Sequence, residues 1–376
     1  MQQGGRIGVF GGSFDPVHTG HLMLAENARV QAHLARVLFM PTHIQPFKQG
    51  KEVSPDDDRL RMLQFALRDN PYFGVSTVEI DRGGVSYTID SLRMLKEDFQ
   101  FRTVFILGTD MFLMIEKWHK ADELLREFDL AVGVRPGYRH DEAIALAGKL
   151  RAAYGTRIDL IDNPPIELSS TELREALRPY ATGAPGAEAS RGEAKYSLRY
   201  LVPEDVRRFL FVRAKEGESR FAHTKRVMDL AAYMATLFGE DPHRAQIAAL
   251  LHDYCKLDGG GEAAMLENNL AHGPMAAEAA RSEFGVTDED VLSAIRWHTT
   301  GRAGMSRLEL IIFLADTVEP GRTYDGADRL RALCLEDLEK GGYTVLVELR
   351  EYLLKKGYTV TSSTEEAIVD LKARIA

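Results

Sequence analysis

GGSFDPVHTGH, at Gly11–His21, follows a short apolar run and precedes an amphipathic segment. This order predicts a strand, a glycine-containing turn and then a helix that begins near Thr19. Glycines at such a turn let backbone amides approach a phosphate, and the helix N-terminus adds unpaired N–H donors. His18 and His21 are three residues apart, so both imidazoles lie on one side of the first helical turn. The run predicts a phosphate site in which two imidazoles stabilise the charge of an in-line attack, without a covalent intermediate.

The first half of the chain alternates short apolar runs with amphipathic ones. Such alternation predicts a Rossmann-like α/β domain with a parallel sheet, helices on both faces and ligands at the carboxyl ends of the strands. The expected strands are Arg6–Gly11, Val37–Pro41, Val75–Ile80, Thr103–Gly108, Asp129–Val134 and Arg157–Ile161. The expected helices are His21–Leu34, Pro55–Arg68, Thr88–Phe99, Asp122–Phe128 and Asp141–Tyr154.

Helical periodicity replaces the strand pattern after Pro203 and predicts an all-α C-terminal domain. We place a linker at Lys215–Arg220 and expect domains at 1–215 and 216–376. A polar Ala/Gly-rich segment, Thr182–Ala194, predicts a mobile loop, and whether it closes over substrate stays open. The clearest helices of the second half are Phe221–Phe238, Pro242–Lys256, Met275–Phe284, Asp288–His298 and Arg307–Thr317.

Composition limits the classes of protein to which the chain can belong. Hydrophobic residues make up 45% and charged residues 27%, which is typical of a soluble globular protein. Its two cysteines, Cys255 and Cys334, have no disulfide or metal-binding spacing, so we expect a reducing cytoplasm. No stretch approaches the roughly 18 uninterrupted apolar residues needed to span a bilayer, so we expect no membrane attachment. The net charge of −9 lies entirely after Lys215. Neither half has the basic excess of a nucleic-acid-binding protein, so phosphate ligands must meet local groups or metal cations.

The HTGH motif at His18–His21 matches the HxGH signature of the nucleotidyltransferase superfamily. Over about 200 residues, the first half resembles bacterial nicotinate-mononucleotide adenylyltransferases. PTHIQPFK, at Pro41–Lys48, is similar to a family segment that ends in Pro-His-Lys, with Phe47 where His is usual. The resemblance implies that Lys48 acts with His18 and His21. It also implies that ATP, bound with Mg²⁺, is held by Gly11, Gly12, Ser13, Phe14, Gly108, Asp110, Ser169, Ser170, Thr171 and Arg174.

Other segments resemble the family's acceptor site. Tyr87 and Thr88 correspond to the segment that lines the nicotinate pocket, Trp118 to the aromatic residue that stacks on the pyridine ring, and Arg135 to an Arg-Pro-Gly turn. A planar ring suits an aromatic face, and its carboxylate suits amides and hydroxyls. The implied reaction transfers AMP from ATP to nicotinate mononucleotide, giving deamido-NAD and pyrophosphate. Nicotinamide mononucleotide and pantetheine phosphate are the alternative acceptors.

A second constellation of polar residues is spread over the helical half. His252 and Asp253 end the apolar run Ile247–Leu251, and Asp316 ends a second apolar run. Burying such groups is costly unless a partner satisfies them, and a metal ion does so. Imidazole and carboxylate suit Fe, Mn or Zn, and six ligands are enough for two ions that could support phosphoanhydride hydrolysis. The candidate ligands are His223, His252, Asp253, His272, His298 and Asp316.

This pattern resembles the HD superfamily of metal-dependent phosphohydrolases. His298-Thr299-Thr300-Gly301 and Glu319-Pro320-Gly321-Arg322 are similar to bacterial symmetrical diadenosine tetraphosphate hydrolases of the YqeK type. The resemblance implies a di-iron-like site that splits this substrate into two ADP. His223, His252, Asp253 and Asp316 would hold one metal, His272 and His298 would complete the second, and Asp253 would bridge. Lys256 and Arg322 are the implied phosphate contacts.

Together, the two resemblances predict a natural fusion of two enzymes acting on adenylyl compounds. For the second domain, the alternatives are a nucleotidase or cyclic-nucleotide phosphodiesterase of the same superfamily, and a non-catalytic nucleotide or metal sensor. The sequence leaves the oligomeric state open, including a homo-oligomer.

Overall fold

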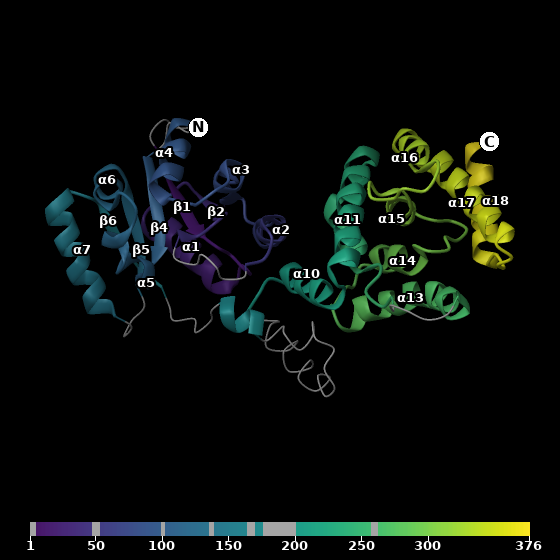
Figure 1. Ribbon diagram of the computed structural model, residues 1–376, viewed down its shortest axis with the longest axis horizontal. Helices are drawn as coiled ribbons and strands as arrows, with labels where there is room; N and C mark the ends of the chain where they lie inside the picture. Colours follow the sequence, from purple (N-terminus) through teal and green to yellow (C-terminus); the bar gives the residue numbers. More distant parts are fainter. Residues whose placement is uncertain are drawn as a thin grey trace. The chain divides into compact units, whose positions relative to one another are not determined.

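The structure, a computed structural model, describes residues 5–46, 53–98, 102–134, 139–163, 170–175, 201–256 and 262–376 (Figure 1). The chain divides into two compact units, Met1–Arg207 and Arg208–Ala376. The division falls inside helix α10 (Glu204–Lys215), whereas the sequence suggests a boundary after Lys215. Helix α11 (Glu218–Phe238) begins three residues after α10 ends, so the helix break falls within the predicted linker Lys215–Arg220.

The first unit is built on a parallel six-stranded sheet in the order β3-β2-β1-β4-β5-β6. This is the strand order of a Rossmann fold, in which the chain reverses direction across the sheet between β1 and β4. The predicted fold class is confirmed. The strands are β1 (Arg6–Gly12), β2 (Arg36–Pro41), β3 (Phe73–Val75), β4 (Arg102–Gly108), β5 (Asp129–Val134) and β6 (Ile158–Asp162).

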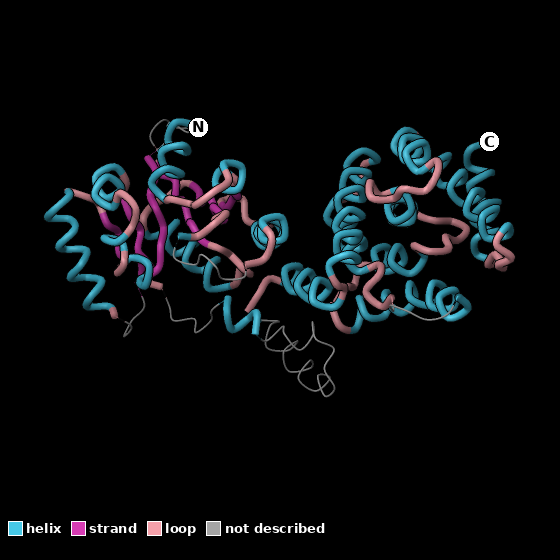
Figure 2. Tube along the Cα trace, viewed as in Figure 1, coloured by secondary structure: helices cyan, strands magenta, loops and turns pink. Residues whose placement is uncertain are grey.

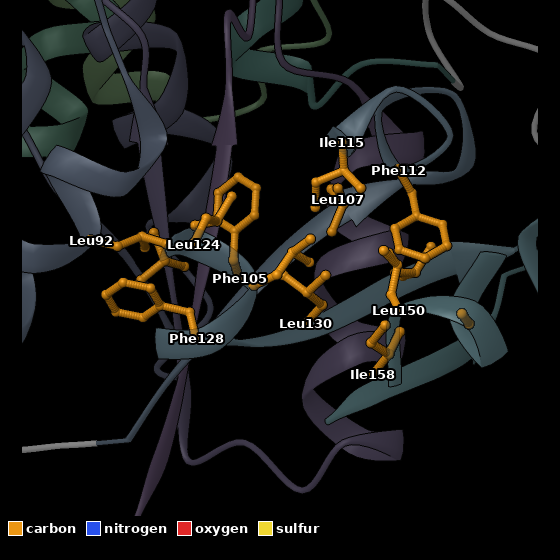
Figure 3. Packing of buried hydrophobic residues seen from close by; sticks show 14 of the residues in the cluster. Leu92, Phe105, Leu107, Phe112, Ile115, Leu124, Phe128, Leu130, Leu150 and Ile158 are labelled. Atoms are coloured by element: carbon orange, nitrogen blue, oxygen red, sulfur yellow. The ribbon is translucent and has the colours of Figure 1, made fainter. Parts of the chain in front are cut away.

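Helices cover both faces of this sheet, which explains why all six residues of β5 are buried. On one face, Val9, Phe105 and Leu130 pack with residues of α4, α6 and α7 (Figure 3). On the other face, α1 lies so close to the sheet that a Cβ on Gly133 would overlap Leu24 of that helix. The helices are α1 (Thr19–Gln31), α2 (Asp56–Leu67), α3 (Val78–Arg82), α4 (Thr88–Asp98), α5 (Thr109–Phe112), the 3-10 helix η2 (Ile115–Lys117), α6 (Ala121–Glu127) and α7 (His140–Tyr154).

One strand prediction is wrong. In the segment Val75–Ile80, only Val75 belongs to a strand: Phe73–Val75 pairs with β2, and Val78–Arg82 forms helix α3. The β-branched residues of this segment favour a strand locally, yet β3 lies at the edge of the sheet and pairs over three residues only. Tertiary context overrides such a propensity. The change matters because α3 carries the buried Glu79.

In its described residues, the second unit contains helices and loops but no strand (Figure 2). Its central helix is α15 (Arg307–Val318), whose residues Leu308–Ala315 are all buried and which packs against α11, α14 and α17. The other helices are α12 (Pro242–Leu251), α13 (Glu262–Ser282), α14 (Glu289–Trp297), α16 (Ala327–Glu336), α17 (Leu338–Lys355) and α18 (Ser362–Ile375). The all-α prediction is therefore confirmed. Among the described residues, no helix combines the length and apolar character needed to cross a bilayer.

Candidate functional sites

A cleft of about 680 Å³ opens at the carboxyl ends of β1 and β4. Gly11 and Gly12 end β1, and Gly108 ends β4, so the cleft lies where the strand order reverses. Ligands of open α/β sheets bind at this position, because the connections from the two strands leave in opposite directions and separate there. The described site residues predicted for this unit all line the cleft: Gly11, Gly12, Ser13, Phe14, His18, His21, Tyr87, Thr88, Gly108, Asp110, Trp118, Ser170, Thr171 and Arg174.

The two histidines of the HTGH motif stack on each other at the start of α1. Their ring centroids are 3.7 Å apart, with an interplanar angle of 30°. His18 is the N-cap residue of α1, and its backbone N–H donates to His21 Nδ1 at 3.3 Å. This bond uses Nδ1 as an acceptor, so a neutral His21 carries its proton on Nε2. Both rings therefore belong to the helix N-terminus, where N–H groups and the helix dipole favour an anion.

Aromatic side chains pack against the stacked histidines and hold the turn before α1 in place. Phe14 packs edge-on against His21 at 5.1 Å and against Phe10 of β1 at 5.4 Å. Phe14 is 1% exposed and has a φ of 49°, in the left-handed region that costs about 1–2 kcal/mol for a residue other than glycine. Burial of the phenyl ring offsets this cost. The turn is thus held in one conformation by packing as well as by its glycines.

The predicted acceptor residues lie together on another wall of the cleft. Tyr87 stacks on His119 at 4.2 Å, and Trp118 packs edge-on against Phe105 of β4 at 5.9 Å. The indole Nε1 of Trp118 is buried and has no hydrogen-bond partner among the described residues. An unsatisfied buried donor is costly, so a ligand acceptor would be favoured here. The wall combines aromatic faces with polar groups, which suits a flat ring that carries a polar substituent.

A carboxylate that the sequence pattern does not single out lies behind this wall. Glu79 of α3 is 1% exposed, lines the cleft and accepts a hydrogen bond from Ser91 Oγ at 2.7 Å. Burial raises the pKa of Glu79, and the hydroxyls of Ser91 and Ser86 oppose that rise. Ser86 precedes Tyr87 and links this wall to the loop after β2, since its Oγ accepts from the His43 backbone N–H at 3.0 Å. The sequence predicts a strand at Val75–Ile80 and assigns Glu79 no role in the site.

The helical segment 170–175 lies against the loop that precedes α1. Ser170 Oγ donates to the Pro16 carbonyl at 3.1 Å, and Arg174 donates to the Asp15 carbonyl. Arg174 also donates to Thr171 Oγ1 at 3.2 Å. The structure thus brings hydroxyls and a guanidinium from far along the chain to the glycine turn. Lys48, Arg135, Ser169 and the 182–194 segment lie outside the described residues.

Arg59 of α2 is a second residue absent from the sequence predictions. It is fully buried, donates to the Ser13 carbonyl at 2.8 Å and to the Ser54 carbonyl at 3.0 Å, and pairs with Asp56. A buried guanidinium needs such acceptors, because an unpaired buried charge is very costly. Arg59 therefore fixes the glycine turn from α2. An arginine within an apolar helical face is the signal that could have indicated it.

In the second unit, six side chains from different parts of the helical fold converge on one cluster. His252, Asp253, His272 and His298 are buried, and His223 and Asp316 are partly exposed. His272 Nε2 lies 3.1 Å from Asp253 Oδ1 and 2.8 Å from His298 Nε2. His252 Nε2 lies 3.6 Å from Asp253 Oδ2 and 3.8 Å from Asp316 Oδ1. His223 Nε2 lies 3.0 Å from Asp316 Oδ1. The two oxygens of Asp253 face different neighbours: Oδ1 faces His272 and His298, and Oδ2 faces His252.

Backbone carbonyls determine which nitrogen two of these histidines present. His252 Nδ1 lies 2.7 Å from the Ala249 carbonyl, and His298 Nδ1 lies 2.7 Å from the Ile295 carbonyl. A carbonyl only accepts, so each Nδ1 carries the proton and each Nε2 offers its lone pair. His252 Nε2 is buried and has no hydrogen-bond partner within the described parts of the chain. Burial lowers the pKa of His252 to about 4, which keeps it in the neutral form that ligates metals.

The two carboxylates stay ionised despite their burial. Burial by itself would raise the pKa of Asp253, but His252, His272, His298 and Lys256 together hold it well below its usual range. Burial likewise opposes ionisation of Asp316, and the neighbouring imidazoles of His223 and His252 lower its pKa. Imidazole lone pairs and carboxylate oxygens within 4.8 Å of one another form two groups, His223–His252–Asp316 and His252–Asp253–His298. This donor set, with an orphaned buried nitrogen at its centre, fits divalent cations.

Cationic side chains flank the cluster. Lys256 Nζ lies 2.8 Å from Asp253 Oδ2, and Arg322 Nη2 lies 2.9 Å from Asp316 Oδ1. Both are partly exposed, so each can reach outward as well as to its carboxylate. The predicted phosphate contacts are thus beside the candidate metal ligands.

Three residues of the second site have no role assigned to them in the sequence predictions. Glu319 is 1% exposed and lies 3.1 Å from His223 Nδ1. The pKa of Glu319 falls to about 2, because Arg226, His223 and the Gly321 N–H outweigh the effect of burial. Thr299 Oγ1 lies 3.1 Å from His298 Nε2 and 3.4 Å from His272 Nε2. Gly273, next to His272, lets α13 approach α14, since a Cβ there would be 2.7 Å from the Arg296 carbonyl oxygen.

Comparison with known proteins assigns a family to each part of the chain. The Cytidylyltransferase-like family matches residues 9–176, and the HD domain family matches residues 220–321. A probable nicotinate-nucleotide adenylyltransferase from a Thermoanaerobacter species is 36% identical over 212 residues, which is 56% of this chain and 93% of the relative. The nicotinate-nucleotide adenylyltransferase of Bacillus subtilis is 34% identical over 206 residues, which is 54% of this chain and 95% of the relative.

Among solved structures, a protein of Clostridium acetobutylicum described as a predicted HD superfamily hydrolase involved in NAD metabolism is 36% identical. The match covers 42% of this chain and 92% of that protein, with a TM-score of 0.40. The family assignment rests on the sequence matches. By its first part the chain belongs to the nicotinate-nucleotide adenylyltransferase family, and by its second part it is an HD-domain protein.

Proposed function

We propose that the first unit transfers the AMP group of ATP to nicotinate mononucleotide, forming deamido-NAD and releasing pyrophosphate. The observation that carries this proposal is the stacked pair His18 and His21 at the N-terminus of α1, inside the cleft where the strand order reverses. The Bacillus subtilis relative, with the same activity in its name, supports it. In-line transfer needs no covalent intermediate. The site's task is to position two phosphates and to neutralise the charge that grows between them.

Each wall of the cleft has a proposed role. The imidazoles of His18 and His21 donate to oxygens of the α-phosphate, and the glycine turn gives the amides access to the polyphosphate. Ser170, Thr171 and Arg174 hold the distal phosphates, because hydroxyls and a guanidinium at a helix N-terminus form a polyphosphate clamp. Gly108 and Asp110 bind the rest of the nucleotide. Lys48, Arg135 and Ser169 keep the roles that the resemblance implies, and Mg²⁺ accompanies ATP.

The acceptor lies against Trp118, with its ring on the indole and its polar groups toward Tyr87 and Thr88. The carboxylate of nicotinate is the substituent that hydroxyls and amides recognise best, because a charge-assisted hydrogen bond is about twice as strong as a neutral one. A carboxamide loses that gain. We therefore propose nicotinate rather than nicotinamide mononucleotide as the acceptor.

Turnover of nicotinate mononucleotide, nicotinamide mononucleotide and pantetheine phosphate under identical conditions tests the acceptor. We expect the acid to be preferred at least 10-fold over the amide, on the order of the gain from one charged hydrogen bond, and pantetheine phosphate to be inactive. Trp118→Ala should raise the KM for nicotinate mononucleotide more than the KM for ATP. Equal turnover of acid and amide, or an unchanged acceptor KM in this variant, would contradict the assignment of this wall.

We propose that the second unit is a phosphohydrolase that splits diadenosine tetraphosphate symmetrically into two ADP. Its support is the convergence of six ionisable side chains on one cluster, with the two oxygens of Asp253 turned to different neighbours. Divalent cations bound here, iron in our proposal and Mn²⁺ or Zn²⁺ as substitutes, would supply Lewis acidity toward phosphate oxygens.

The chain's own residues divide the remaining tasks. His223, His252 and Asp316 would hold one ion, His272 and His298 would hold the other, and Asp253 would be shared between them. Lys256 and Arg322 bind phosphate oxygens of the substrate and orient the bond that breaks. A symmetrical substrate suits a site with cations on two sides, because each end of the polyphosphate chain carries the same charge.

A panel of dinucleoside polyphosphates, mononucleotides and cyclic nucleotides, assayed with Fe²⁺ and with Mn²⁺, tests this proposal. We expect diadenosine tetraphosphate to give ADP as the sole product, without ATP or AMP. Preference for a mononucleotide would make the unit a nucleotidase, and preference for a cyclic nucleotide would make it a phosphodiesterase. Nucleotide binding without hydrolysis of any member would favour a sensor.

A further inference from the structure

Glu319 stands at the C-terminal end of α15, directly behind His223. Its Oε1 lies 3.1 Å from His223 Nδ1, on the side of the imidazole opposite Asp316. Its Oε2 accepts from Arg226 Nε at 2.6 Å and from the Gly321 N–H. Both oxygens are therefore occupied, and the carboxylate is held from three directions.

Glu319 fixes the role of one nitrogen of His223. A carboxylate only accepts, so Nδ1 carries the proton that it donates to Glu319. Nε2 lies 3.0 Å from Asp316 Oδ1, which is also an acceptor, so a proton or a metal cation must lie between them. A bound cation would replace that proton, and the Glu319 contact turns His223 so that Nε2 faces the candidate metal ligands.

Arg226 holds the Glu319 carboxylate in this position. A Cβ on Gly321 would overlap the guanidinium of Arg226, so this side chain lies directly against the backbone of Gly321. Arg226 donates to both oxygens of Glu319, at 2.6 Å and 3.2 Å. Arg226 neutralises a carboxylate that is 1% exposed and would be costly to bury alone.

We propose that Glu319, fixed by Arg226, is a positioning residue that orients His223 and raises the affinity of the metal position formed by His223, His252 and Asp316. This inference rests on the proposed metal-binding function of the second unit. A carboxylate behind a ligating histidine fixes the ring and makes it a better donor, and loss of such a partner weakens metal binding about 10- to 100-fold.

Titration of metal-stripped full-length protein with Mn²⁺, followed by calorimetry, tests the inference. Glu319→Gln keeps the shape of the side chain and removes its charge. We expect the wild type to bind two equivalents and Glu319→Gln to bind one of them about 10- to 100-fold more weakly. Arg226→Gln, which leaves Glu319 in place, should weaken binding of the same Mn²⁺ equivalent by a smaller factor. Asp253→Ala, which removes the ligand shared by the two positions, gives the background of Mn²⁺ binding elsewhere on the chain.

Glu309 provides a matched control on the same helix. It lies at the opposite end of α15, is 2% exposed, pairs with Arg302 at 2.8 Å and accepts from Ser293 Oγ and the Ser306 N–H. Glu309→Gln should lower thermal stability and leave both Mn²⁺ affinities unchanged. If Glu319→Gln, folded as judged by circular dichroism, binds both equivalents as tightly as the wild type, the inference is wrong. If the wild type itself binds no Mn²⁺ above the background, the proposed function of the unit fails instead.

Discussion

Histidine serves two different purposes in this chain, and the surroundings of each ring decide which. His18 and His21 stack at a helix N-terminus inside the cleft, where two rings can donate to one anion. His252 and His298 are almost fully buried, and backbone carbonyls hold their Nδ1 protons, so their Nε2 atoms can only accept. Imidazole N–H groups that donate suit a phosphate anion, and imidazole nitrogens that accept suit a metal cation.

Replacement of His18 or His21 by Ala should reduce adenylyl transfer about 10²-fold or more, because each ring removed is a preorganised donor to the charge that develops in transfer. Hydrolysis by the second unit should not change. Steady-state rates of pyrophosphate release and of ADP formation, measured on the same preparation, check both expectations.

His33 supplies the control for these variants. It is exposed beyond the opposite end of α1 and has a φ of 53°, so His33→Asn suits its backbone conformation. This variant should transfer AMP at the wild-type rate. Near-wild-type transfer by His18→Ala or His21→Ala would mean that the stacked pair is not the catalytic centre.

Glu216 makes the stability of the second unit depend on pH. It is 1% exposed, accepts from Thr224 Oγ1 at 2.7 Å, and burial raises its pKa to about 7. Its protonated form therefore stabilises the fold below about pH 4.5, and this contribution is lost as the pH rises to about 7. His252 acts in the opposite sense: because its pKa falls to about 4, stability is lost as the pH falls from about 6.5 to 4.

The two effects oppose each other in the wild type, and Glu216→Gln should separate them. At pH 8 the metal-stripped variant should be more stable than the wild type by up to about 3 kcal/mol, since Gln cannot ionise in the buried position. Between about pH 6.5 and 4 the variant should lose stability more steeply than the wild type, because the His252 effect is no longer offset. Urea unfolding of the second unit, followed by circular dichroism at several pH values, measures how the free energy of unfolding of each protein depends on pH. Parallel curves for the wild type and Glu216→Gln would contradict the raised pKa of Glu216.

Among the elements, the approach of α13 to α14 determines whether the second site can form. His272 belongs to α13 and His298 follows α14, and their Nε2 atoms lie 2.8 Å apart. Gly273 makes this approach possible, because any side chain there would meet the Arg296 carbonyl. Pro274 follows inside the helix and does not interrupt it.

Gly273→Ala should therefore push α13 away from α14, lower the melting temperature of the second unit and reduce its Mn²⁺ affinity. A 2.7 Å contact with backbone cannot relax by side-chain rotation, so we expect a loss of about 1–3 kcal/mol, as in other overpacked sites. Differential scanning calorimetry and Mn²⁺ titration of the metal-stripped protein measure the two effects.

Gly148 supplies the control for this substitution. It is an exposed glycine within α7 of the first unit, and a Cβ added to it would meet no atom within 4 Å. Gly148→Ala should leave stability unchanged or raise it, since alanine is the better helix former. Equal behaviour of the two variants would rule out the close-approach argument.

For the molecule as a whole, each site is completed inside one compact unit, so the two activities should respond to metals independently. Mg²⁺ binds oxygen ligands and phosphates, whereas imidazole ligands favour Fe, Mn or Zn. After chelation and dialysis, Mg²⁺ alone should restore adenylyl transfer, while hydrolysis should return only with Mn²⁺ or Fe²⁺. Parallel assays on one chelated sample check this, with Asp253→Ala as the variant that lacks hydrolysis under every condition. Recovery of hydrolysis by Mg²⁺ alone would contradict the proposed ligand set.

Local pattern is enough to predict most elements of both units. Strand Asp129–Val134 is found with the expected bounds, and the helices that begin near Thr19 and Glu289 lie within a few residues of their predicted positions. One exception is Val75–Ile80, where β-branched residues favour a strand and the edge of the sheet supplies a partner for Phe73–Val75 only. Another is the helix expected at Met275–Phe284, which begins earlier, at Glu262. The helix predicted at Pro242–Lys256 ends early, at Leu251, so His252 and Asp253 leave the helix and enter the cluster.

By itself, the sequence determined what depends on neighbours along the chain: the strand, glycine turn and helix around GGSFDPVHTGH, the change to helical periodicity after Pro203, and the candidate residues of both sites. Tertiary structure decided which distant residues support those candidates. Local sequence does not show the roles of Arg59 at the glycine turn, Glu79 behind the acceptor wall and Glu319 behind His223, because these roles come from hydrogen bonds to residues brought near them by folding. A buried charge is tolerated only where the fold supplies its partners, and sequence spacing does not record those partners.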